Sequence, residues 1–140
     1  MTEMPVEPDL HFLDEDAVLT PPEAERYLKQ VRNELARAQI SLRRLRYAEL
    51  KLKKEHTEAR TALMFSAECP QVGRGEGHVT VDERDLWINA RIPCHWTYES
   101  SQVQRKNAED YLHTVGKQVS IAQSLNNAAK ELYNSSGGGR

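Results

Sequence analysis

The feature that most constrains this chain is an apolar repeat between Pro21 and Ser66, in a stretch that predicts one uninterrupted helix. Apolar residues recur there at alternating steps of three and four, and neither Gly nor Pro follows Pro22 within the segment. The repeat consists of Ala24, Leu28, Val31, Leu35, Ala38, Leu42, Leu45, Leu52, Ala59 and Leu63. This spacing predicts one long helix with a heptad seam. A helix of that length needs a partner helix along its seam.

The start of this helix has its own signal. In Thr20-Pro-Pro-Glu23 the threonine hydroxyl can accept a hydrogen bond from a backbone N–H of the first turn, and proline tolerates that turn. Two expected seam positions are polar, Glu49 and His56. We interpret His56 as a packed structural residue rather than a ligand.

The second half of the chain repeats the pattern after a break. Proline and three glycines predict a loop over residues 67–79. A second capping signal, Thr80 to Glu83, begins a helix predicted over about 80–133, with a kink at Ile92-Pro93. Its seam consists of Ala108, Tyr111, Val115, Ala122, Leu125, Ala129 and Leu132, with Gln104 and Gln118 as polar members.

The fold class predicted is therefore all-α, a long antiparallel helical hairpin resembling a coiled coil, with a kinked second helix. Residues 20–134 form the hairpin domain, residues 1–19 a flexible acidic arm and residues 135–140 a flexible tail. One shared seam leaves other apolar side chains exposed in a monomer, which predicts a homo-oligomer. The side chains on which this prediction rests are Ile40, Tyr47, Leu50, Leu112 and Val119.

Composition agrees with a thin core. Charged residues make up 29% of the chain, which has only two Phe and two Trp. No apolar run is long enough to span a bilayer and the N-terminus is acidic, so we expect a soluble, cytoplasmic protein without membrane contact. Cys69 and Cys94 lack zinc-ligand spacing; we interpret them as small buried hydrophobic residues, with a disulfide left open.

Charge is distributed unevenly. The formal net charge is −2, yet residues 1–25 hold eight acidic side chains and no Lys or Arg, whereas Glu49 is the only acid between residues 37 and 54. This asymmetry predicts phosphate contacts, with a solvated helix surface as the alternative. The candidate nucleic-acid-binding residues are Arg37, Arg43, Arg44, Arg46, Lys51, Lys53, Lys54 and, in the glycine loop, Arg74.

Catalytic and metal-binding motifs are missing from the sequence. The five histidines have no helical i, i+4 pairing, and the glycine loop lacks the ending of a phosphate-binding P-loop. We therefore expect no enzyme, no catalytic residue, no cofactor and no metal. Trp87, Trp96 and Tyr98 lie near the predicted kink. We interpret them as a hydrophobic plug, with a base-stacking platform as the alternative.

Three segments carry a resemblance to known proteins: Leu45–Lys54, the helix start Val79–Trp87, and the closing helix Gln123–Tyr133. This layout, over about residues 23–133, resembles small helical proteins encoded by tailed phages near recombination genes. More distantly, it is similar to the UvsY-type recombination mediators. These bind single-stranded DNA, form ring-like homo-oligomers and help load a RecA-like recombinase onto strands covered by single-strand-binding protein.

The resemblance implies a non-catalytic accessory protein of phage homologous recombination, acting in the cytoplasm of an infected bacterial host. Its implied partners are single-stranded DNA and a RecA-like recombinase or single-strand-binding protein. The alternative is a structural or adaptor coiled coil that binds another protein and has no role with nucleic acid.

Overall fold

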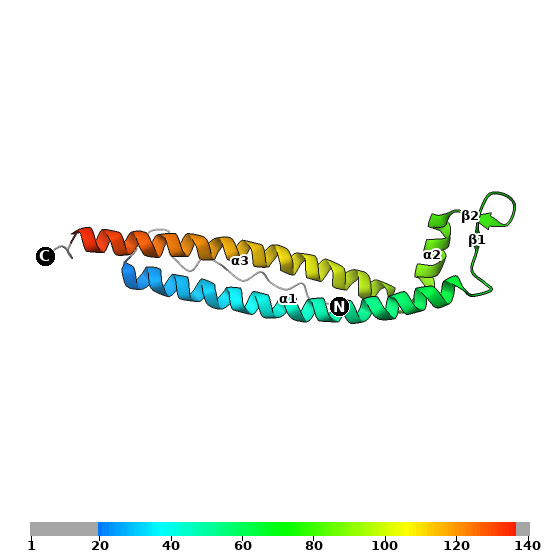
Figure 1. Cartoon of the computed structure of the whole chain (residues 1–140), viewed down its shortest axis with the longest axis horizontal. Coiled ribbons are helices and arrows are strands. Elements are labelled where there is room, and N and C mark those ends of the chain that lie inside the picture. Colours follow the sequence, from blue (N-terminus) through cyan, green and yellow to red (C-terminus); the bar gives the residue numbers. More distant parts are fainter. Residues whose placement is uncertain (1–19, 137–140) are drawn as a thin grey trace. The chain divides into compact units, whose positions relative to one another are not determined.

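The computed structural model describes residues 20–136, which are mostly helical (Figure 1). Helix α1 (Pro21–Met64) is followed by two short strands, β1 (Gln71–Val72) and β2 (His78–Val79), and then by helices α2 (Val81–Arg91) and α3 (His95–Ser136). The predicted acidic arm and the end of the predicted tail lie outside the described residues.

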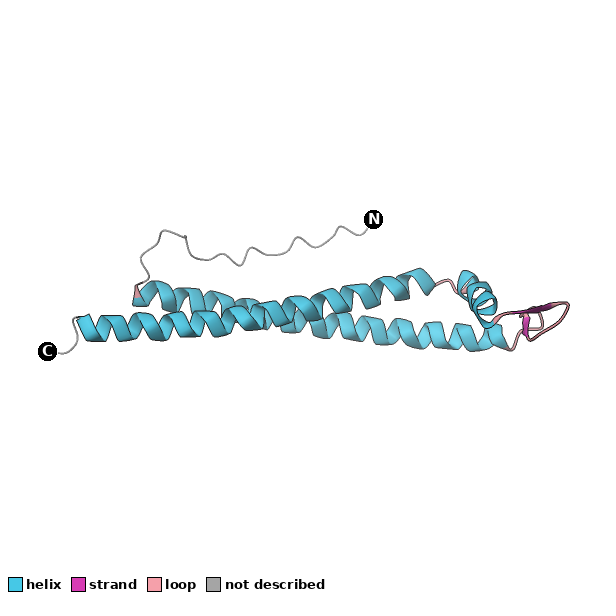
Figure 2. Cartoon of the chain, turned by 90° about the horizontal axis from the view of Figure 1, so that it is seen from above, coloured by secondary structure: helices cyan, strands magenta, loops and turns pink. Residues whose placement is uncertain are grey.

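The described chain divides into two compact units. The first combines residues 20–41 of the start of α1 with residues 108–136 of α3. The second comprises residues 42–107, which hold the rest of α1, both strands, α2 and the start of α3. Figure 2 colours these elements by secondary structure.

The first unit is an antiparallel helix pair, as predicted. The Tyr27 hydroxyl donates to Oε1 of Gln118 at 3.1 Å, and the Tyr111 hydroxyl donates to Oε1 of Glu34 at 2.7 Å. The contacts pair higher residue numbers on α1 with lower residue numbers on α3, so the two helices are antiparallel. The buried cluster of this unit consists of Tyr27, Leu28, Val31, Val115 and Ala122. Four of these five residues belong to the predicted heptad seams, and Tyr27 is an addition that the spacing did not select.

The exposure predicted for one side chain of this unit is wrong. Val119 was expected to stay exposed in a monomer, but it packs against the buried cluster. The physical reason is helical geometry, because Val119 follows Val115 by four residues and so shares its face. Leu112, placed in the same group, is half-buried. Ile40, by contrast, is exposed as expected.

In the second unit, α1 and α3 are again antiparallel. Glu49 of α1 pairs with Arg105 of α3, and His56 pairs with His95. The two polar interruptions of the α1 seam therefore face polar partners. The predicted seam member Gln104 is exposed, which is a correction. Ser101 is buried instead, and the seam runs from it by a step of four to Arg105.

Helix α2 contacts the end of α1 within the second unit. Its cap is the predicted one, with Oγ1 of Thr80 accepting from the backbone N–H of Glu83 at 3.2 Å. Arg60 of α1 bonds Asp85 of α2 at 3.1 Å, and Ile88 of α2 is fully buried. Figure 1 shows α2 turned away from the direction of the α3 residues that belong to the same unit.

The stretch predicted as one kinked helix is divided into α2 and α3 by residues 92–94. Pro93 lies in this break and has no backbone N–H to donate to a continuing helix. The predicted loop contains the parallel pair β1–β2, with Gln71 opposite His78. Gly75 and Gly77 allow the intervening turn, since both have positive φ, 125° and 81°.

Cys69 and Cys94 are half-buried and are not joined by a disulfide. Among residues 20–136, none of the helices combines the length and apolar character needed to cross a bilayer.

Candidate nucleic-acid interface

The strongest concentration of cations is on α1 between residues 42 and 54, here called the α1 basic segment. All six of its cationic side chains are exposed: Arg43, Arg44, Arg46, Lys51, Lys53 and Lys54. At 100° per residue, Arg43, Lys51 and Lys54 lie opposite the seam, with Arg44 next to Lys51. Arg46 and Lys53 flank the seam on one side. The cations thus surround the solvent side of this part of α1.

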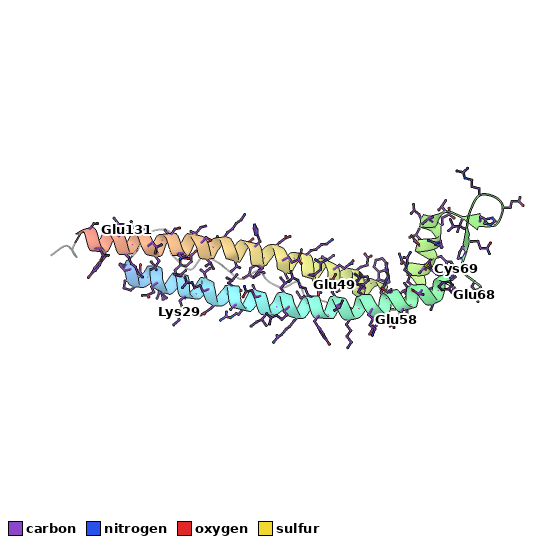
Figure 3. The ribbon with its side chains drawn as sticks, in the orientation of Figure 1. Lys29, Glu49, Glu58, Glu68, Cys69 and Glu131 are labelled. Carbon is purple, nitrogen blue, oxygen red and sulfur yellow. The ribbon has the colours of Figure 1, made fainter. Side chains whose placement is uncertain are left out.

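The position of Glu49 increases the effect of this charge. Glu49 is the only acid of the α1 basic segment. Its side chain is 13% exposed and binds Nε of Arg105 on α3 (Figure 3). This pairing directs the carboxylate of Glu49 to α3. The charged side chains that this segment exposes to solvent are therefore all cations.

Two predicted binding residues lie apart from this segment. Arg37 belongs to the first unit, where its guanidinium contacts the carboxylate of Glu34 at 3.4 Å. Arg74 is exposed in the turn between β1 and β2, beyond the end of α1 (Figure 1). The structure therefore groups six of the eight predicted residues on one helical segment.

Two apolar side chains share the solvent face of the α1 basic segment. Tyr47 is 72% exposed and Leu50 is 65% exposed. From sequence we assigned both to a subunit interface. Tyr47 lies four residues after Arg43 and four before Lys51, so it shares a helix face with both cations.

The aromatic plug predicted near Pro93 is wrong for Trp96, which is 78% exposed. Trp87 is half-buried, and the guanidinium carbon of Arg91 lies 4.0 Å from its ring centroid. Tyr98 packs on His56, with ring centroids 4.7 Å apart. The three aromatic residues therefore have three different environments, because the chain breaks between α2 and α3.

A pair of histidines joins α1 to the first turn of α3. Nε2 of His56 lies 3.0 Å from Nδ1 of His95, a hydrogen-bond distance. Nε2 of His95 lies 3.8 Å from a carboxylate oxygen of Glu99. This contact needs at least one of the two facing nitrogens without its proton, because two N–H groups cannot point at each other.

Burial lowers the pKa of His56 below its ordinary value of 6.5. The neighbouring His95 and Arg60 lower this pKa further, whereas the Glu99 carboxylate raises it. The folded chain therefore favours neutral His56.

This shift predicts a loss of stability in acid. Because folding lowers the pKa of His56, the unfolded chain takes up a proton more readily just below pH 6.5. The contribution of His56 is complete above that pH and is lost as the pH falls toward the folded-state pKa. Thermal unfolding at a series of pH values should show a decline of a few degrees that His56→Gln removes. The exposed His113→Gln is the control, and an equal effect of both variants would contradict this assignment.

The first unit has a polar groove of about 520 Å³ between α1 and α3. It is lined by Glu25, Leu28, Lys29, Arg32, Asn33, Gln123, Asn126, Asn127 and Lys130. Side-chain amides and three cations dominate this lining. Sequence reasoning did not select these cations, because acids are interspersed with Lys29 and Arg32 on α1 and Glu131 follows Lys130 on α3.

Comparison of the chain with protein-family models, with curated proteins and with solved structures finds no match.

Proposed function

We propose that this chain is a non-catalytic accessory protein that binds single-stranded DNA along the α1 basic segment. The observation that carries the proposal is the exposure of all six cations of the segment while its only acid, Glu49, is paired with Arg105. A strand of phosphates neutralises such a surface and releases its own counterions on binding. Contacts of this kind do not depend on base sequence.

The resemblance to UvsY-type mediators supports a more specific role. In this role the chain binds single strands as a homo-oligomer and helps load a RecA-like recombinase during phage recombination. Two exposed apolar side chains outside the basic segment favour the proposal of an oligomer, because contact between subunits would bury them. They are Ile40 and Ile121 in the first unit. Repetition of the α1 basic segment around an oligomer multiplies the number of phosphate contacts.

The test is a titration of fluorescently labelled oligonucleotide at several salt concentrations. Each phosphate contact on a single strand contributes about −0.7 to the slope of log affinity against log salt, so six contacts give about −4 per subunit. We expect strong salt dependence and equal affinity for oligonucleotides of different sequence. Absence of binding even at low salt would reject the proposal.

The alternative function, an adaptor that binds another protein, has an observation of its own. Phe65, Leu86 and Trp96 of the second unit are all exposed, and large apolar residues are enriched at the centres of protein interfaces. An adaptor requires no affinity for DNA. The oligonucleotide titration therefore separates the two functions.

A further inference from the structure

Tyr47 lies at the centre of the cationic surface of α1. Its neighbours at three and four residues along the helix are Arg43, Arg44, Leu50 and Lys51, so three of the four are cations. Tyr47 lies opposite the seam, and its side chain is 72% exposed. A large ring is thus presented to solvent in the middle of a surface that attracts phosphates.

A second copy of this chain is a poor occupant for this surface. Covering Tyr47 with the same helix of another subunit would bring Arg43, Arg44 and Lys51 close to their own copies. Removing these cations from water without opposite charges costs free energy, and like charges repel. A polyanion with flat aromatic groups matches both components of the surface.

We propose that Tyr47 is a base-stacking residue that makes the α1 basic segment selective for single strands over duplexes. This inference rests on the proposed function and adds the source of its selectivity. The bases of a single strand offer their faces to an aromatic ring, whereas those of a duplex are stacked on one another. The cations neutralise phosphates of either form, while the ring contacts a base only in the single strand.

The expected loss of affinity follows from the free energy of base stacking on protein aromatic residues, which is about 1 to 3 kcal/mol per base. Tyr47→Ala should therefore weaken binding of single strands by roughly 5- to 150-fold per engaged base. Duplex affinity should change little, since no phosphate contact is removed. For the same reason, the salt slope for single strands should keep its wild-type value.

The experiment compares full-length wild type, Tyr47→Ala, Tyr47→Phe and the control Tyr133→Ala by fluorescence anisotropy. The probes are a labelled thymidine oligonucleotide and a duplex of equal length. We expect Tyr47→Phe and Tyr133→Ala to bind like wild type, because the former keeps the ring and the latter changes an exposed tyrosine on α3. In a photocrosslinking experiment, an oligonucleotide that contains 5-iodouracil should become attached to the peptide that contains Tyr47.

The outcomes separate this inference from the function on which it rests. If wild type binds neither probe, the proposed function fails and this inference with it. If wild type binds single strands and Tyr47→Ala binds them equally well, only the role of Tyr47 is overturned. A change of oligomeric state in Tyr47→Ala, detected by light scattering at unchanged affinity, would assign the residue to a subunit interface and also overturn it.

Discussion

Replacing the six cations of the α1 basic segment with Gln should reduce affinity for single-stranded DNA by on the order of 10³-fold at low salt. The six changes are Arg43→Gln, Arg44→Gln, Arg46→Gln, Lys51→Gln, Lys53→Gln and Lys54→Gln. Each removes one potential phosphate contact, and the salt slope should become much shallower. Gln has nearly the helix propensity of Arg and Lys, so α1 should remain intact. Circular dichroism and anisotropy titrations measure the two properties separately.

A control with the same change of charge is available elsewhere on α1 and α3. Six other exposed cations can be changed to Gln: Arg26, Lys29, Arg32, Lys106, Lys117 and Lys130. Three of these line the polar groove of the first unit. If binding depends on the α1 basic segment, this control should lose much less affinity for single-stranded DNA, because only the total charge of the protein changes. Equal losses in both variants would mean that net charge, rather than the segment, determines affinity.

Val31→Asp should unfold the helix pair of the first unit. Val31 is fully buried in the cluster with Leu28 and Val115, and few large apolar side chains support this core. An unpaired carboxylate there should cost at least about 4 kcal/mol, a large part of the stability of a typical domain. Val31→Ala leaves only a small cavity and should cost about 2 kcal/mol.

Urea unfolding followed by far-UV circular dichroism measures these differences. The matched control is Gln30→Asp, which introduces the same carboxylate at an exposed neighbouring position. It should change the free energy of unfolding by less than about 1 kcal/mol, because the charge stays in water. A similar midpoint for Val31→Asp and Gln30→Asp would contradict the packing of this face.

The seam of α1 could be predicted from sequence because burial there repeats with the period of the helix. Val31 and Leu42, both selected from their spacing, are buried. The antiparallel arrangement also followed from the sequence, since the predicted loop allows the chain to reverse. These features depend on local periodicity and chain geometry, which a sequence displays directly.

Specific partners could not be predicted in the same way. His56 and His95 are 39 residues apart, and no periodic pattern connects them. The partner of Glu49 depends on how α3 is aligned along α1, which several heptad registers would satisfy equally well. Trp96 was misassigned because the break before α3 fixes the direction of its first turn, and burial of an aromatic residue depends on that direction.

The cations of the candidate interface were selected from the sequence, whereas Tyr47 was predicted to lie between subunits. The excess of cations between residues 43 and 54 is visible in composition alone. Tyr47 was assigned to a subunit contact because it is an apolar residue off the seam. Its place in the sequence is the same whether a subunit or a ligand covers it. The structure adds that Glu49 pairs with Arg105 and that Tyr47 is exposed beside Arg43, Arg44 and Lys51.

The opposite placement of the seam and of Tyr47 on α1 has a consequence for how this sequence can change. Within residues 42–54, the side chains that hold α1 against α3 and the side chains offered to solvent form two separate sets, apart from the flanking positions. A substitution in one set leaves the other physically undisturbed. The exposed surface of this helix can therefore change by single amino-acid substitutions while the packing against α3 is kept.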